Sequence, residues 1–442
     1  MQQFNKIKHY MVLRSSIFVG VFFLLTLPVI VKAQSNSSPY SIVGIGNIQT
    51  SSYDAYTGMG GSCIALSNTK YINAANDASL SKLNNHVFTF ELAVRSSLVG
   101  YSGGNLVAYT PNQKAPSPTF DLAFRRLSIA TKITNHWGLS LGLRPYSTAN
   151  YDYTADKLVQ GNNQSTLLGE YHGTGGLNQL YLGNGYQITR NTSLGVNTSV
   201  VWGSLKQTET LLSTAALGGL ITENYIYLSG GYFNFSLQTK KRLSHQWVSS
   251  YGVTYSPKTT LHASYSVTVT DAFSDTLKND PLQNDRYTIP GLLKLGIAFV
   301  KNDKYTFTIN AQEQDWSTVK PNAFQQVAAG SYKLVNSNKL SLGYQKSNRL
   351  RNIYGIEYEQ SFFQLGLYGA NTYLQILGNQ VTDFGVTMGY GRNSKHNGLG
   401  YYLGFEAGRR GSWDSQVLSE NYFNLNLVFS YSDRWMKGRK YY

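Results

Sequence analysis

The stretch Asn421–Trp435, which reads NYFNLNLVFSYSDRW, decides which fold the chain adopts. Apolar side chains occupy every second position, and Asn or Ser fills most positions between them, with Val428 as the exception. The two sets are Phe423, Leu425, Leu427, Phe429 and Tyr431 on one side and Asn424, Asn426, Ser430 and Ser432 on the other. Because successive strand residues point to opposite faces, the pattern predicts a strand with one apolar and one polar face. The fold depends on whether the apolar face contacts a protein core or lipid.

The first residues predict that the protein is exported. Three basic residues precede the apolar run Ile17–Val31, and an A-x-A-like sequence that ends at Ala33 follows it. These features are typical of a secretory signal peptide over residues 1–33, with cleavage between Ala33 and Gln34. A retained N-terminal anchor is the alternative. After Ala33 no run approaches the roughly 18 apolar residues of a spanning helix, so the sequence predicts none.

Composition favours a β-rich chain with a polar interior. Charged residues make up only 14% of the chain, against about 25% in ordinary soluble domains, while Tyr and Gly are abundant, at 34 and 42 residues. The net charge of +15 is spread along the chain without a cluster of Lys and Arg. In an exported protein this indicates charges that face water or the head groups of the bilayer and of lipopolysaccharide, and no nucleic-acid partner.

The alternation of the C-terminal stretch recurs throughout the chain. Residues 293–299 and 305–311 both alternate, and the tight turn Lys301–Lys304 joins them. Segments of about ten residues separated by turns are typical of transmembrane strands. The candidate strands are 87–101, 119–133, 136–148, 176–189, 192–207, 224–241, 246–256, 259–270, 288–301, 304–317, 338–347, 361–374, 380–391, 397–410 and 421–435.

An exported bacterial barrel should have an even number of strands, but these candidates number fifteen. The short break Ser256–Lys258 contains Pro257, which a bulge tolerates, so 246–270 is expected to be one strand. The resulting fourteen strands alternate short turns with long polar loops, and both ends of the chain then lie on the periplasmic side. The long loops are predicted at 102–118, 149–175, 208–221, 271–287 and 318–337.

The predicted fold is therefore all-β: a transmembrane antiparallel β-barrel over residues 87–442, whose apolar faces contact lipid. Closing the sheet satisfies every backbone polar group, as a bilayer requires. Residues 34–86 lack the alternation but carry scattered apolar residues, which favours a compact hatch, or plug, inside the barrel. A surface-packed or flexible leader is the alternative.

Several segments, in their order and spacing, resemble the FadL/TodX-type outer-membrane transport proteins, in the divergent form seen in Bacteroidetes. The segments are Gly58–Gly61, Ile72–Leu80 (INAANDASL), Tyr287–Phe299, Asp315–Ser317, Leu418–Phe423 and Asp433–Trp435. Two positions depart from the family pattern, because Ala74 and Asp77 stand where prolines are usual. The chain also runs past Trp435, so the terminal aromatic read by the barrel assembly machinery is either Trp435 or Tyr442.

This resemblance implies a fourteen-stranded barrel in the Gram-negative outer membrane, with an N-terminal hatch. It also implies passive uptake of hydrophobic small molecules, such as long-chain fatty acids or aromatic compounds. The candidate hatch or gating residues are Gly58, Met59, Gly60, Gly61, Asn73, Asn76 and Asp77. The glycines would supply backbone freedom, and the Asn and Asp side chains would cap or anchor a short turn. Ordinary turn residues are the alternative interpretation.

The sequence gives little support for catalysis. The histidines are isolated, so no catalytic residue is assigned, and no metal or cofactor is expected. Cys63 is the only cysteine, which excludes an intrachain disulfide and favours a small buried residue. Two acidic residues, Glu91 and Asp121, are expected to pair inside the barrel with an arginine. The candidate partners are Arg95, Arg125 and Arg144.

Two other functions stay open. A barrel of the same shape could serve as a partner in secretion or surface assembly and bind other proteins through its loops. A barrel hydrolase is the less favoured alternative, and it would need a His near a carboxylate or Ser at one rim. An enlarged interior cavity lined with apolar residues would favour uptake, whereas large exposed periplasmic or outer loops with an occluded interior would favour the partner role.

Overall fold

A computed structural model describes residues 38–103, 118–159, 162–212, 219–319, 332–351, 357–376, 378–394, 398–412 and 418–434. All of these residues belong to one compact unit, Ser35–Tyr442. The predicted signal peptide, its cleavage site at Ala33 and Gln34, and the C-terminal tail from Trp435 to Tyr442 lie outside the described residues.

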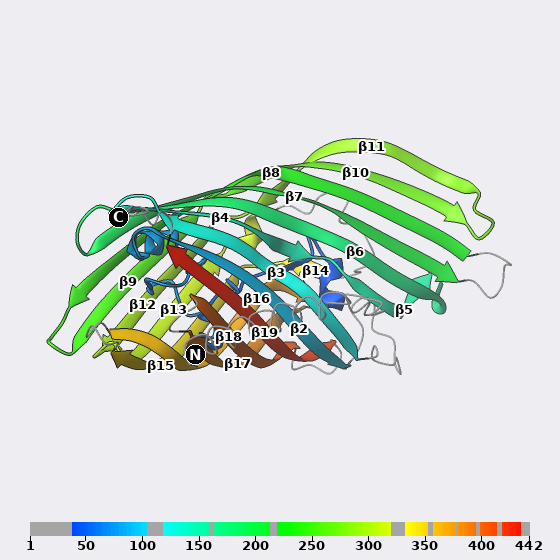
Figure 1. Ribbon diagram of the computed structural model, residues 1–442. Coiled ribbons are helices and arrows are strands. Elements are labelled where there is room, and N and C mark those ends of the chain that lie inside the picture. Colours follow the sequence, from blue (N-terminus) through cyan, green and yellow to red (C-terminus); the bar gives the residue numbers. More distant parts are fainter. Residues whose placement is uncertain are drawn as a thin grey trace, which may run out of the picture. The chain divides into compact units, whose positions relative to one another are not determined.

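The strands form a closed antiparallel sheet (Figure 1). They are β2 (Val87–Ser102), β3 (Thr119–Lys132), β4 (Trp137–Thr148), β5 (Tyr151–Val159), β6 (Asn162–Gln187), β7 (Thr192–Leu212), β8 (Gly219–Arg242), β9 (Trp247–Ser256), β10 (Thr259–Asp271), β11 (Thr276–Ile289), β12 (Leu292–Lys301), β13 (Tyr305–Gln314), β14 (Tyr332–Leu334), β15 (Ser337–Arg351), β16 (Glu357–Ile376), β17 (Asn379–Asn393), β18 (Leu399–Gly411) and β19 (Ser419–Arg434). Four neighbouring pairs, β4/β5, β9/β10, β11/β12 and β14/β15, are each one interrupted strand, and β19 pairs with β2 to close the sheet. The barrel therefore has fourteen strands, as predicted.

The break at Pro257 is the predicted interruption within one strand. Both β9 and β10 pair with β8, so the chain continues along the same neighbour across Pro257 and Lys258. Directly opposite, Pro290 and Gly291 interrupt β11/β12 in the same way. Proline has no N–H to donate to a ladder, so placing both prolines at one level confines the missing hydrogen bonds to one level.

The apolar face of the opening stretch points outward. On β19, Phe423 and Phe429 are about half exposed, at 46% and 52%, whereas Asn424 and Asn426 face inward and are buried. Exposed apolar side chains follow the same rule along the other strands, which makes the outer surface of the barrel lipid-compatible. Among the described residues no helix is long and apolar enough to cross a membrane.

Three of the predicted long loops are wrong, because most of their residues are paired strands. Residues 149–175 form β5 and much of β6, while 208–221 and 271–287 are largely the ends of β7, β8, β10 and β11. The apolar residues of these segments do not recur at every second position, so their sequences carry no sustained alternation, and backbone pairing with neighbours holds them extended. Most of the other two loops, 102–118 and 318–337, lies outside the described residues.

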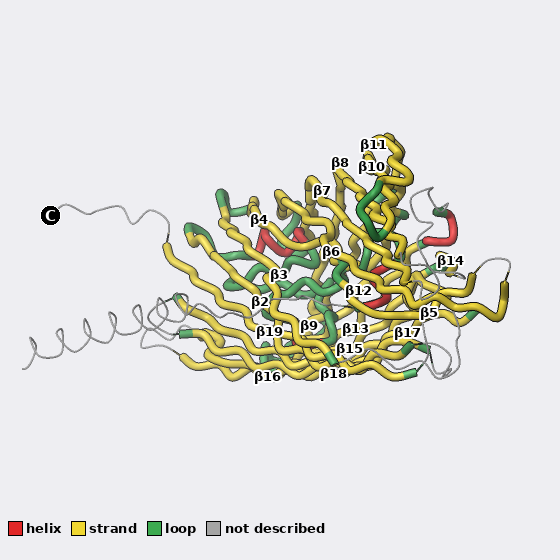
Figure 2. The backbone as a smooth tube through the Cα atoms, turned by 90° about the vertical axis from the view of Figure 1, so that its right-hand side faces the viewer, coloured by secondary structure: helices red, strands yellow, loops and turns green. Residues whose placement is uncertain are grey.

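The two ends of the barrel differ. At the short-turn end, residues 133–136, 188–191, 243–246 and 302–304 connect the strands, and β2 begins and β19 ends there. At the opposite end, the long-strand end, β10 and β11 stand out from the rest of the sheet (Figures 1 and 2). Among the described strands β11 pairs only with β10, because the chain after β13 turns inward at η4 (Trp316–Thr318), where Trp316 is fully buried.

Residues 38–86 lie inside the barrel and form the hatch. They contain three short 3-10 helices, η1 (Pro39–Ile42), η2 (Thr57–Met59) and η3 (Asp77–Lys82), and a two-residue strand, β1 (Asn47–Ile48). The hatch starts near the long-strand end, where the Ser38 N–H donates to the Asn150 carbonyl. It ends at the short-turn end, where His86 leads into β2.

Candidate functional site

The hatch backbone lies directly against glycines of the barrel wall. A Cβ built on these inward-facing glycines would come closer than 3.0 Å to atoms of the hatch, so no larger residue fits without displacing it. The glycines with such a contact are Gly138, Gly183, Gly185, Gly195, Gly252, Gly296, Gly343 and Gly366. They belong to strands on several sides of the lumen, and the hatch is therefore held from around its circumference.

The predicted gating segment Gly58–Gly61 is a tight turn against β17. Gly60 has a φ of +65°, a left-handed conformation that ends η2 and that glycine adopts without strain. Its N–H donates to Thr387 Oγ1 at 2.8 Å, and the same hydroxyl donates to the Gly58 carbonyl at 2.9 Å. Met59 is fully buried, and the Gly61 carbonyl accepts a hydrogen bond from Asn310 Nδ2. The turn is fastened to the wall on both sides.

The two asparagines organise the rest of the hatch. Asn73 is buried, and its Nδ2 donates to the carbonyls of Cys63 and Leu66 at 2.7 and 2.8 Å. Asn76 caps η3 by accepting from the Ala78 N–H, and its Nδ2 donates to the Ile64 carbonyl. Both side chains thus join hatch segments that are about ten residues apart, which stabilises one compact conformation.

Asp77, the first residue of η3, is a buried acid in the hatch. Its two carboxylate oxygens accept from Asn197 Nδ2 on β7 at 3.2 Å. Burial raises the pKa of the Asp77 carboxyl to about 6, although the hydrogen bond from Asn197 opposes this shift. The folded hatch therefore binds the Asp77 proton more tightly than an unfolded chain does.

We expect the stability of the hatch to fall as the pH rises from about 4 to about 6 and to stay low above that range. The reason is that the pKa of Asp77 is higher in the folded state than its ordinary value of 3.8. Asp77→Asn should weaken this dependence and raise the free energy of unfolding at pH 7 by no more than about 3 kcal/mol. Thermal unfolding in detergent at pH 4 and pH 7 measures the difference. The exposed Asp275→Asn should behave as wild type. Equal pH dependence in Asp77→Asn and wild type would contradict the prediction.

A buried ion pair joins the barrel wall to the hatch, but its partners differ from those predicted. Glu91 pairs with Arg126, and both side chains are fully buried. Arg126 Nε also donates to the Tyr53 carbonyl, and the Ile72 N–H donates to Glu91 Oε1, both at 3.0 Å. The prediction missed Arg126 because a β-bulge shifts the β2–β3 register and turns both Arg125 and Arg126 inward.

Asp121 pairs with one of the predicted candidates. Its carboxylate lies 3.7 Å from the Arg125 guanidinium, and both side chains are buried. Arg125 also donates to Gln49 Oε1 of the hatch at 3.3 Å and lies over the Tyr53 ring. Both acids therefore help to fix the position of the hatch.

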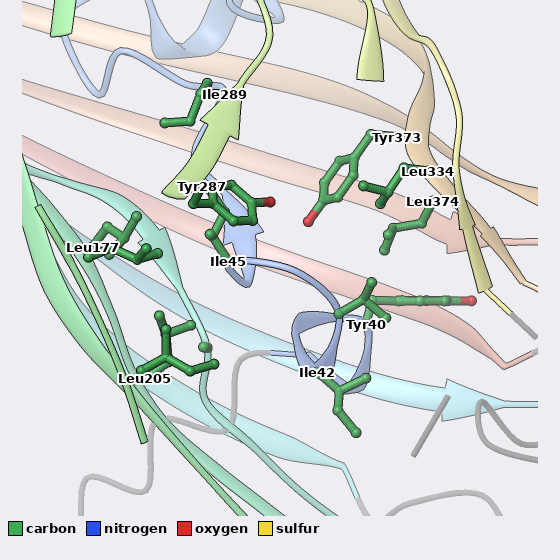
Figure 3. Packing of buried hydrophobic residues seen from close by; sticks show 14 of the residues in the cluster. Tyr40, Ile42, Ile45, Leu177, Leu205, Tyr287, Ile289, Leu334, Tyr373 and Leu374 are labelled. Atoms are coloured by element: carbon green, nitrogen blue, oxygen red, sulfur yellow. The ribbon is translucent and has the colours of Figure 1, made fainter. Parts of the chain in front are cut away.

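The chain's own N-terminal residues fill the apolar part of the lumen. Tyr40, Ile42 and Ile45 of the hatch pack among buried side chains of several strands near the long-strand end (Figure 3). The wall residues labelled there are Leu177, Leu205, Tyr287, Ile289, Leu334, Tyr373 and Leu374. The Tyr40 hydroxyl donates to the Leu418 carbonyl, and burial raises the pKa of this phenol well above its ordinary value. Hatch side chains thus occupy this apolar region.

Two cavities beside the hatch are small and lined mainly by polar groups. One of about 180 Å³ is lined by a network in which Tyr368 donates to Glu406 and Tyr422 donates to Asp383, each at 2.6 Å. Arg95, Lys339 and Arg410 also border it. A second cavity, of about 120 Å³, is likewise lined mainly by Asn, Gln, Ser and charged residues. An apolar ligand would desolvate these groups without replacing their hydrogen bonds.

The barrel wall is incomplete between β3 and β4. The hydrogen-bonded ladder joins only Leu127–Lys132 to Gly138–Leu143, next to the short turn. From there toward the long-strand end, β3 and β4 are not paired with each other. There β1 of the hatch pairs with β4, Asn47 opposite Thr148 and Ile48 opposite Ser147. The hatch therefore supplies a short piece of the wall at this opening.

The projecting hairpin β10–β11 carries three of the most exposed large apolar side chains among the described residues. Phe273, at its tip, is 74% exposed, and Leu277 and Leu282 are each 61% exposed. Charged residues surround them, including Lys278, which pairs with Asp280 at 2.8 Å. Exposed apolar groups with a polar rim, beyond the lipid-facing band, are typical of a protein-binding surface.

The candidate residues bring no catalytic or metal-binding group together. Within the described ranges, no three His, Cys, Asp or Glu side chains gather in a way that could hold a metal ion. Cys63 is buried in the hatch, and burial raises the pKa of its thiol. A raised pKa keeps the thiol protonated, which is the unreactive form.

Comparison with known proteins connects the chain to one family and one fold. The model of the family described as BamG matches residues 12–442. No curated protein matches the sequence. The structure is similar to that of a Pseudomonas aeruginosa FadL homologue, with a TM-score of 0.60 and 12% identity over 88% of this chain and 100% of that one.

Two toluene transporters have the same fold. TodX of Pseudomonas putida matches with a TM-score of 0.54 and 16% identity, over 89% of this chain and 100% of that one. TbuX of Ralstonia pickettii matches with a TM-score of 0.53 and 15% identity, over 85% and 97% of the two chains. At these identities the similarity shows the fold alone. The predicted likeness to FadL/TodX barrels thus holds for the architecture, whereas the family match is to BamG.

Proposed function

The chain belongs to the BamG family, and we propose that it acts in the outer membrane as a partner protein of the barrel assembly machinery. This function corresponds to the surface-assembly alternative drawn from the sequence, and it takes precedence over hydrophobic uptake. The match of the family model over residues 12–442 carries the proposal.

The interior of the barrel supports a partner role. Hatch residues Tyr40, Ile42 and Ile45 occupy the apolar part of the lumen, and the two cavities described beside the hatch are lined mainly by polar groups. Hydrophobic binding gains about 25 cal/mol for each Å² of apolar surface that is buried, so cavities lined mainly by polar groups offer an apolar ligand little affinity. The occluded interior and the projecting hairpin β10–β11 therefore support a partner role over uptake.

We propose that a subunit of the assembly machinery docks on the hairpin β10–β11. Phe273, Leu277 and Leu282 would be buried in this contact, because they are exposed together on the projecting hairpin and charged residues surround them. Each such side chain contributes about 1.5–3 kcal/mol when it is fully buried. The triple variant Phe273→Ser, Leu277→Ser, Leu282→Ser should therefore lower co-purification of the assembly subunits at least about tenfold.

The measurement is affinity purification from the native host, with mass spectrometry to identify assembly subunits, together with photo-crosslinking from position 273. Leu243→Ser is the matched control, because Leu243 is 51% exposed at the opposite end of the barrel. Retention of the same subunits by the triple variant would reject this docking surface. Absence of every assembly subunit from the wild-type purification would reject the function itself.

Uptake of hydrophobic compounds is the second candidate function. The FadL-like fold and the opening between β3 and β4, which β1 covers, are the observations that favour it. Purification in mild detergent followed by mass spectrometry of small molecules tests it. A hydrophobic compound bound near one per chain would support uptake, whereas preparations free of such compounds would speak against it. That the chain is not an enzyme remains a prediction.

A further inference from the structure

A groove on the outer surface of the barrel lies where the lipid-facing apolar rows end. Its volume is about 270 Å³, and β15, β16, β17 and β18 line it near the long-strand end. Strand parity places Gly369, Phe384 and Arg409 of its lining on the outer face, in register with the exposed Leu340 of β15. The groove therefore opens to the outside of the barrel, although Asn338, Ala370, Asn371 and Asp383 of its lining also border the 180 Å³ cavity beside the hatch.

One level of the sheet forms the base of the groove. Cross-strand pairing aligns Leu340 with Gly369, Gly369 with Phe384, and Phe384 with Arg409. Gly369 makes a notch between two larger side chains, because a Cβ added there would meet no atom within 4 Å. Leu340 and Phe384 are 54% and 55% exposed and face lipid on either side of the notch. The notch is as wide as one side chain, and the apolar side chains of Leu340 and Phe384 flank it.

The next outward-facing level of the sheet, toward the long-strand end, is polar. Asn338 pairs with Asn371, Asn371 with Thr382, and Thr382 with Gly411, so two amides and a hydroxyl edge the groove beside Arg409. The outward-facing side chains of β18 run from Phe405 through Ala407 to Arg409, so Arg409 follows the last apolar one. The Arg409 Nη2 donates to Ser419 Oγ at 3.3 Å. A guanidinium at this depth offers donors to an anion at the membrane boundary.

We propose that this groove binds a membrane lipid that carries a phosphate group. The phosphate accepts hydrogen bonds from Arg409 and from the hydroxyl and amides above it, and one acyl chain lies in the notch at Gly369 against Leu340 and Phe384. The order of the two levels, polar above apolar, matches the order of head group and acyl chain in a bilayer leaflet. The site does not depend on the function proposed above.

Native mass spectrometry of the full chain in detergent, with added phosphatidylglycerol, tests the site. Arg409→Gln should lower the affinity of the tightest bound lipid about tenfold, because charge-assisted hydrogen bonds to phosphate are lost. Gly369→Leu should lower it as well, because leucine fills the notch. Arg392→Gln is the matched control, because Arg392 is exposed on the outward row of β17 at the opposite edge of the apolar band, and it should bind as wild type.

Two further ligands identify the source of the affinity. Dioleoylglycerol, which lacks the phosphate, and inorganic phosphate, which lacks the acyl chains, should each fail to displace phosphatidylglycerol from wild type. Displacement by inorganic phosphate alone would reduce the site to an anion site and overturn the proposal, and so would displacement by dioleoylglycerol. Equal losses in Arg409→Gln and Arg392→Gln would also overturn it. A gel shift between heated and unheated samples verifies that each variant is folded.

Discussion

Valine in place of Gly366 should unseat the hatch and open the lumen to ions. A Cβ at this position would lie closer than 3.0 Å to the backbone of Met59 and Gly60, which cannot move as a flexible side chain would. The turn would lose the hydrogen bond from the Gly60 N–H to Thr387 Oγ1. Overpacking of this kind costs about 1–3 kcal/mol, so the conformation in which the hatch lies against the wall glycines should become a minor one. Single-channel conductance in planar bilayers should rise from near zero to a level typical of an open pore.

Gly231→Val is the control for this substitution. Gly231 is an exposed residue of β8, and a Cβ there would meet only the Phe233 side chain, at 3.8 Å. Its conductance should equal that of wild type. If Gly366→Val stayed as closed as Gly231→Val, close seating of the hatch on the wall glycines would be wrong.

Arg126→Met should cause the largest loss of stability among single substitutions. It leaves the Glu91 carboxylate without its buried cation and removes the bond to the Tyr53 carbonyl. Removal of one partner of a buried ion pair costs about 3–5 kcal/mol. Thermal unfolding in detergent, followed by the loss of the folded band on gels, measures the change.

The double variant Arg126→Met, Glu91→Gln separates the charge from the packing. Glutamine keeps an acceptor for the Ile72 N–H at this position but carries no charge. We expect the double variant to recover a substantial part of the stability that the single variant loses. Equal instability of the two would mean that lost packing and lost hydrogen bonds, rather than an unpaired buried charge, set the cost.

The barrel could be predicted from local alternation because each spanning strand separates lipid from lumen. The pattern around Phe423 and Phe429 depends only on the chemistry of those two sides, so it survives in each strand taken alone. Even the strand number followed, once Pro257 was assigned to a break inside one strand. The same reasoning could not reach the paired segments 149–175, 208–221 and 271–287, because their apolar residues do not recur at every second position.

Because the alternation depends only on the lipid and the lumen beside each strand, the resemblance to FadL/TodX proteins predicted the fold but not the family. Lipid imposes one pattern on all such barrels, whatever their partners are. The short capping motif at Asn76 was also predictable, since its acceptor for the Ala78 N–H lies two residues away.

Contacts between distant segments were beyond the reach of the sequence. The partner of Glu91 depends on a bulge that turns Arg126 inward, and the wall glycine Gly366 meets Gly60 across about 300 residues of chain. Likewise, only the folded chain places Tyr40 and Ile45 in the apolar lumen, and only strand register aligns Gly369 with Phe384 and Arg409. Alternation along one strand states which side a residue faces. The strand register, the β-bulges and the path of the hatch determine which residues that side chain contacts, and all three depend on the closure of the whole sheet.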